Sequence, residues 1–141
     1  MRKKINYSII VIILVIITVI YVNHTYFFNP LVFNQDKITP HAWSDYQRPL
    51  ILKLYRFDEK REIFTIKKEE KIREYLKALK KSAEMDQKVS GSGTPIGGLT
   101  LSTGDTKLLD ILFYNDYWVI LKQDRSAFEM TNSLKQLFQS Y

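Results

Sequence analysis

The stretch INYSIIVIILVIITVIYV, residues 5–22, decides how this chain of 141 residues is organised. Ile, Val and Leu fill every face of a helix drawn through it, so no polar stripe remains for water. A helix over this stretch rises about 27 Å, close to the ~30 Å hydrocarbon core of a bilayer. The stretch therefore predicts one membrane-spanning helix, with the lipid bilayer as its partner.

The flanks of this stretch predict its orientation. Arg2, Lys3 and Lys4 stand directly before it, and the next basic residue is Lys37. Because basic flanks stay on the cytoplasmic side, residues 1–4 should be cytoplasmic and the rest of the chain extracytoplasmic, as in a single-pass protein of the cell membrane. A cleaved signal peptide begins in the same way. The apolar run is longer than a signal core and lacks a small-residue cleavage site after it, which favours an uncleaved signal anchor.

Composition limits what the outer part of the chain can be. The chain has no cysteine, so a small domain here must be held by its apolar core alone. Residues 2–4 supply half of the formal net charge of +6, which leaves the outer part only mildly basic. This balance argues against a nucleic-acid-binding surface. Richness in Ile, Lys, Asn, Tyr and Phe, which have AT-rich codons, indicates a Gram-positive bacterium of low GC content as the source.

Residues 23–48 form a predicted connector between the span and the domain. Prolines at 30, 40 and 49 interrupt regular structure there. The aromatic residues that follow the span are Tyr26, Phe27, Phe28 and Phe33. They fit either an aromatic belt at the level of the lipid headgroups or a segment that folds back onto the domain.

Residues 49–141 carry the pattern of one small domain. Alternating apolar residues predict strands over 50–55 and 62–66, and a helical period follows over 67–84. After a loop over 86–98, the pattern predicts strands over 99–102, 107–114 and 117–121 and a helix over 132–140. Ser133 and Gln136 would form a capping box for this last helix. The order ββα-βββα predicts an α+β two-layer sandwich, an antiparallel sheet of about five strands with two helices on one face.

The sequence offers no constellation of catalytic or metal-ligating residues. His24 and His41 both lie in the connector, without zinc-ligand spacing or a nucleophile motif nearby. We therefore expect no metal, no cofactor and no catalytic residue. Asp110, within a predicted strand, should be a carboxylate at a rim or paired with Lys or Arg. Its alternative role is an acid that acts on cell-wall material together with the glycine-rich loop.

The predicted hairpin over 107–121 is apolar or aromatic on both faces. One face should pack under the helices, and the other would mark an interaction surface unless something covers it. The glycine-rich loop over 86–98 is either a second part of a binding site or disordered. The candidate binding residues are Trp118, Tyr114, Tyr117, Asp110, Gly91 and Gly93.

The helix predicted over 67–84 is strongly basic. Lys67, Lys71, Lys77 and Lys81 are candidates for contact with anionic lipid headgroups at the membrane surface, and a solvated outer face is the alternative. Taken together, the patterns predict a membrane-tethered, extracytoplasmic binding module, non-catalytic, with a protein or cell-wall partner and no nucleic acid. The alternative is a small accessory enzyme or inhibitor that acts on cell-wall material.

Overall fold

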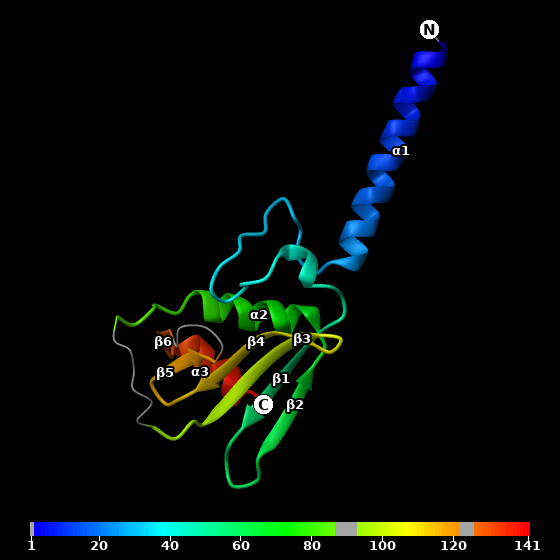
Figure 1. The fold of residues 1–141 in the computed structure, drawn as a ribbon. Helices are drawn as coiled ribbons and strands as arrows, with labels where there is room; N and C mark the ends of the chain where they lie inside the picture. The colour runs from blue at the N-terminus through cyan, green and yellow to red at the C-terminus, as the bar shows by residue number, and fades with distance from the viewer. Residues whose placement is uncertain (1, 87–92, 122–125) are drawn as a thin grey trace.

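The computed structural model describes residues 2–86, 93–121 and 126–141. These residues form three α-helices, a short 3-10 helix and one six-stranded antiparallel sheet (Figure 1). The helices are α1 (Arg2–Thr25), η1 (Trp43–Asp45), α2 (Glu69–Lys80) and α3 (Asn132–Gln139). The strands are β1 (Leu50–Arg56), β2 (Glu62–Ile66), β3 (Gly97–Thr103), β4 (Thr106–Phe113), β5 (Tyr117–Ile120) and β6 (Ala127–Glu129).

Helix α1 projects away from the rest of the molecule (Figure 1). Its segment Tyr7–Thr25 has a mean hydropathy of 2.3 and none of it is buried. It is long and apolar enough to cross a membrane, and an N-terminal signal sequence shares these properties.

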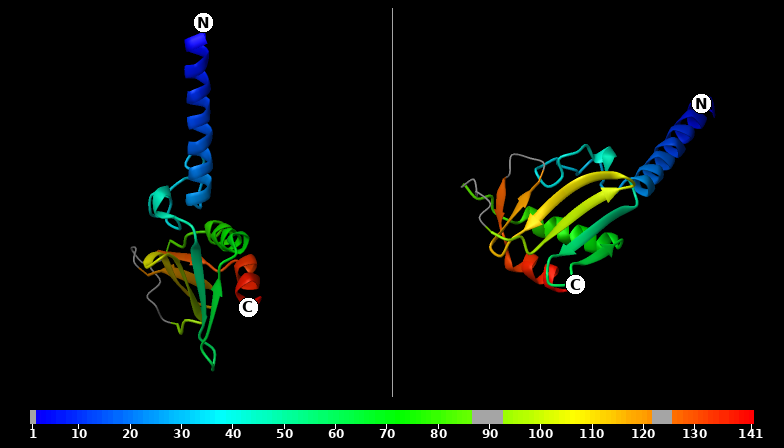
Figure 2. Two further views of the ribbon diagram at one scale, coloured as in Figure 1. Left: turned by 90° about the vertical axis from the view of Figure 1, so that its right-hand side faces the viewer. Right: turned by 60° about the horizontal axis from the view of Figure 1, so that its bottom comes forward.

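The sheet has the strand order β2-β1-β3-β4-β5-β6, and every neighbouring pair is antiparallel. Helices α2 and α3 lie on the same side of it (Figure 2). The predicted α+β class with an antiparallel sheet is confirmed, but the sheet has six strands instead of five. Strand β6 was missed because three residues are too few to show an alternating pattern.

Strand β3 begins at Gly97, two residues earlier than predicted. A Cβ on Gly97 would lie 2.3 Å from the carbonyl oxygen of Tyr55 and 2.5 Å from the ring of Phe138. Only glycine therefore fits where β1, β3 and α3 approach one another. A glycine-rich run resembles a loop in the sequence, but here two of its glycines allow close packing within the sheet.

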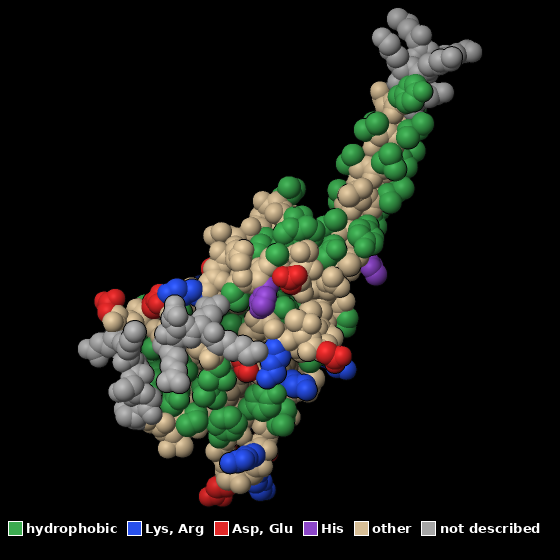
Figure 3. Space-filling model, in the orientation of Figure 1, with side chains coloured by type: hydrophobic (Ala, Val, Ile, Leu, Met, Phe, Trp, Pro, Cys, Tyr) green, Lys and Arg blue, Asp and Glu red, His purple; other side chains and the backbone are tan. Residues whose placement is uncertain are grey.

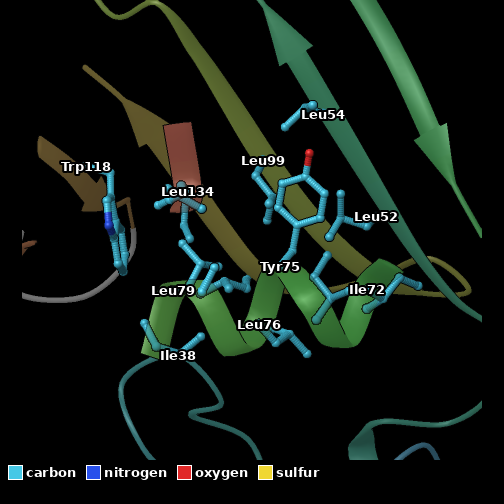
Figure 4. Close-up of a cluster of buried hydrophobic side chains, with 14 of the residues drawn as sticks. Ile38, Leu52, Leu54, Ile72, Tyr75, Leu76, Leu79, Leu99, Trp118 and Leu134 are labelled. Carbon is cyan, nitrogen blue, oxygen red and sulfur yellow. The ribbon is translucent and has the colours of Figure 1, made fainter. Parts of the chain in front are cut away.

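The core lies between the helices and the inner face of the sheet, the face toward α2 and α3 (Figure 4). Helix α2 buries one apolar stripe there, at helical spacing: Ile72, Tyr75, Leu76 and Leu79. Helix α3 adds Leu134 and Phe138. Its N-cap is Thr131, whose hydroxyl accepts a hydrogen bond from the backbone N–H of Leu134 at 3.3 Å, so the predicted capping box at Ser133 and Gln136 is wrong.

The connector folds back onto the domain. Phe27 is 2% exposed and Tyr46 is fully buried, and both belong to the same core as the sheet. The ring of Phe28 packs between those of Phe27 and Tyr46, and the ring of Phe33 packs against Phe28 with centroids 4.9 Å apart. Burial of these rings outweighs the preference of single aromatic residues for the headgroup layer, so the second of the two alternatives is observed.

Arg48 joins the end of α1 to the beginning of α2. Its guanidinium donates hydrogen bonds to the carbonyl oxygens of Asn23 and Tyr26, where α1 ends, and to both carboxylate oxygens of Glu69. The hydrogen bonds between Arg48 and Glu69 lower the pKa of Glu69 and raise the pKa of Arg48. Arg73 adds a hydrogen bond of 2.6 Å to the carbonyl oxygen of Phe27. A cation at the C-terminus of a helix is favourable, and the Arg48 guanidinium also connects the C-terminus of α1 to the domain.

Candidate functional site

The outer face of the sheet, the face away from α2 and α3, carries an ordered apolar row. Strand register places five residues side by side across five strands. From β2 to β5 they are Ile63, Tyr55, Gly98, Leu112 and Val119, here called the outer apolar row. Alternation along each strand turns these residues away from α2 and α3. Ile63 is 62% exposed, Tyr55, Leu112 and Val119 are half-buried, and Gly98 is buried. The row therefore forms an apolar strip that neither helix covers.

The hairpin between β4 and β5 places an aromatic pair at one end of this face. Tyr114 and Tyr117 stack with ring centroids 4.4 Å apart and planes inclined by 11°. Gly93 lies against them, since a Cβ on it would stand 3.4 Å from the ring of Tyr114. Three residues predicted for binding, two from the hairpin and one from the glycine-rich loop, thus come together.

The hydroxyl of Tyr117 is buried and has no hydrogen-bond partner among the described residues. Loss of solvation raises its pKa. A buried hydroxyl without a partner costs free energy.

A polar group borders the outer apolar row. Thr100 and Asp110 are cross-strand neighbours, and the hydroxyl of Thr100 donates a hydrogen bond of 2.8 Å to Asp110 Oδ1. The ammonium of Lys107 donates to Asp110 Oδ2 at 3.2 Å. Both carboxylate oxygens are therefore engaged, as expected for a strand carboxylate paired with a lysine. In the orientation of Figure 1, hydrophobic side chains gather over the strands beside a few charged ones (Figure 3).

Asp110 and Lys107 also line a pocket of about 240 Å³ where the connector meets β4. Pro40 and His41 form its opposite wall. The pocket lies apart from Gly93, which contacts the tyrosine pair at the other end of β4. The predicted combination of Asp110 with the glycine-rich loop is thus not brought into one place by the residues described.

Trp118 lies on the inner face and does not belong to the candidate surface. It is fully buried, stacks on Phe128 with centroids 4.3 Å apart, and donates a hydrogen bond of 3.2 Å from Nε1 to the hydroxyl of Ser82. Trp118 and Ile120 face the helices, while Tyr117 and Val119 face outward. Both sets are apolar, so the sequence could not say which one is covered.

The remaining predicted residues fall into two groups. Gly91 lies outside the described residues. Lys71, Lys77 and Lys81 line a groove of about 450 Å³ between α2 and α3, whereas Lys67 precedes α2 and is not part of its lining. Three of the four predicted basic residues therefore share one place, away from the outer face.

Within residues 2–86, 93–121 and 126–141, no group of three or more His, Cys, Asp or Glu side chains lies close enough to hold a metal ion. Sequence reasoning missed Tyr55, Ile63 and Leu112 as parts of one surface. Their alternation was visible, but only the strand register brings them into one row.

We compared the chain with protein-family models, with curated proteins and with solved structures, and found no match in any of the three. The function is therefore inferred from the geometry of the chain itself.

Proposed function

We propose that this protein is a membrane-tethered binding module, whose domain lies outside the cell and takes a protein or cell-wall partner on the outer face of its sheet. The observation that carries the proposal is the outer apolar row, which crosses five strands and is covered by neither helix. Apolar strips of this kind on small domains favour association, because burial releases about 25 cal/mol per Å² of apolar surface.

The surroundings of the row supply what a binding surface needs besides apolar area. The tyrosine pair offers rigid rings, which are frequent anchors at interfaces. Asp110, Thr100 and Lys107 add polar groups beside the row that can fix the orientation of a partner.

The position of the domain supports a partner at the membrane surface. The apolar helix α1 ends at Thr25, and Arg48 joins that end to Glu69 of α2. A short, bonded junction keeps the domain close to the bilayer instead of releasing it on a long linker. Tethering raises the effective concentration of the domain toward partners in the same layer.

The test is site-specific photo-crosslinking in intact cells that make the full chain with a tag after Tyr141. A crosslinker at Tyr114 should capture a partner. Ile63→Lys should abolish capture, because it places a charge in the outer apolar row. Val32→Lys is the matched control, since Val32 is an exposed apolar residue of the connector. Equal capture by both variants would contradict the proposed surface.

The same cells test the location of the domain. Protease added to intact cells should remove the tag, with a lysis control to show equal expression. Survival of the tag in intact cells, followed by cleavage after lysis, would place the domain in the cytoplasm and overturn that part of the proposal.

A further inference from the structure

The groove between α2 and α3 lies on the opposite side of the sheet from the outer face. We infer that this groove binds a linear, phosphate-bearing polyanion. The inference goes beyond the proposed function, because it concerns a separate surface and a different ligand chemistry. The groove has a volume of about 450 Å³, and α2 contributes Lys71, Glu74, Lys77 and Lys81 to it.

One of the three groove lysines is paired within the protein and the other two are not. Lys71 pairs with Glu74 at 2.7 Å, but Lys77 and Lys81 have no ion pair among the described residues. The basic residues on the connector side of α2 differ, since Arg73 pairs with Glu69 and Lys80 pairs with Asp36. Two uncompensated ammonium groups therefore stand in the same concave surface, where an anion would gain from both.

Helix α3 forms the second wall of the groove. The hydroxyl of Tyr75 donates a hydrogen bond of 2.7 Å to the carbonyl oxygen of Leu137, and Leu134 lies near Leu79 in the core (Figure 4). The two helices therefore run antiparallel, and the N-terminal turn of α3 lies beside the C-terminal half of α2. The negative end of the α2 dipole and the positive end of the α3 dipole therefore lie at the same end of the groove and largely offset each other, so the positive charge there comes from Lys77 and Lys81.

The shape of the groove indicates a linear ligand. Lys77 and Lys81 are one helical turn apart, which separates them by about 6 Å along α2, and Lys71 lies further along the same side. Ser133 and Gln136 line the α3 wall with hydroxyl and amide donors. Lysine acts as a compact point charge toward phosphate, and neutral donors bind its remaining oxygens, so repeated phosphates match this lining.

Two sources present this chemistry, a phosphate polymer free of the membrane and the headgroups of anionic phospholipids. Helix α3 lies farther from α1 than α2 does, so the groove extends along the side of the domain away from the span (Figure 2). Both sources enter the experiment as separate arms.

The experiment uses the full chain in phosphatidylcholine nanodiscs, with linear inorganic polyphosphate as the probe. Lys77→Gln combined with Lys81→Gln should weaken binding at least about ten-fold at low salt. Lys60→Gln combined with Lys67→Gln is the matched control, since it removes the same charge from exposed lysines outside the groove. The control should weaken binding less than about three-fold. Thermal melting checks that both variants fold.

In the second arm, the same nanodiscs are floated with phosphatidylglycerol vesicles. Weakening of polyphosphate binding that is specific to the groove variant supports the inference. Weakening that is specific to the groove variant but seen only with the vesicles would assign the groove to lipid headgroups and overturn a linear polyanion as its ligand. Equal weakening by the groove variant and the control variant would show that binding depends only on the net charge of the protein, and would overturn the inference. Equal binding of polyglutamate, which carries carboxylates only, would overturn the assignment to phosphate.

Discussion

The two faces of the sheet have similar compositions but different surroundings. On the inner face, Leu52, Leu54 and Leu99 are fully buried under α2 and α3. On the outer face, the row that contains Ile63 and Leu112 is apolar as well, yet neither α2 nor α3 lies over it. Two helices are enough to close one core of this size, so an apolar second face is not required for folding. The comparison indicates that the inner face stabilises the domain, and the outer face is the one that we propose for binding.

The largest expected effect is on the inner face, at Trp118. Trp118→Ala removes a fully buried indole and its hydrogen bond to Ser82, and should lower the free energy of unfolding by about 3–5 kcal/mol. Urea unfolding of the full chain in detergent micelles measures this. Tyr114→Ala, on the outer face, should cost less than about half as much. Equal costs would mean that the two faces do not differ in their contribution to stability.

The next largest loss of stability is expected at two adjacent glycines of β3, Gly97 on the inner face and Gly98 on the outer face. Gly97→Ala should cost about 3 kcal/mol, because its Cβ would overlap the Tyr55 carbonyl and the Phe138 ring. Gly98→Ala should cost about 1–2 kcal/mol, because its nearest contact is 2.9 Å, to the carbonyl oxygen of Ile111, and its other neighbours stand at 3.6 Å and beyond. Thermal unfolding of both variants measures the order. The reverse order would show that the outer face is the more tightly packed.

Acid should lower the stability of the fold through Glu69, which pairs with Arg48 where α1 meets α2. The hydrogen bonds from Arg48 hold the pKa of this carboxyl below its ordinary value of 4.5. The pair therefore stabilises the fold fully above about pH 4.5, and this contribution is lost as the pH falls through the lowered pKa. The melting temperature of wild type should drop more steeply between pH 5 and pH 3 than that of Glu69→Gln. Parallel pH profiles would contradict a stabilising junction.

The smallest effect is expected at Asp110, on the outer face. Its ion pair with Lys107 is exposed on the lysine side, and exposed pairs contribute at most about 1 kcal/mol. Asp110→Asn keeps an acceptor for Thr100, so the melting temperature should change by only a few degrees. Lys107→Gln is the matched variant on the other side of the pair. A larger loss in either variant would show that this polar group contributes to folding as well as to the surface.

The sequence predicted the elements with strong periods and missed those whose position depends on contacts. The helix α2, the hairpin of β4 and β5 and the antiparallel α+β class follow from apolar spacing. Strand β6 could not be predicted, because a three-residue strand exists only through pairing with β5. For the candidate site, the sequence indicates Tyr114, Tyr117, Gly93 and Trp118 but leaves open which hairpin face is covered, and the structure places Trp118 on the covered one.

The sequence alone determined the apolar helix, because a continuous run of Ile, Val and Leu leaves no polar face in any arrangement. The observed helix, Arg2–Thr25, extends beyond the predicted residues 5–22 at both ends. The sequence also determined that the hairpin over 107–121 is apolar on both sides. Only the tertiary structure decided which side is covered, since α2 and α3 bury whichever face the register turns toward them. The fold of the connector was decided in the same way, because Phe27 and Tyr46 find the core only once residues distant in sequence have formed it.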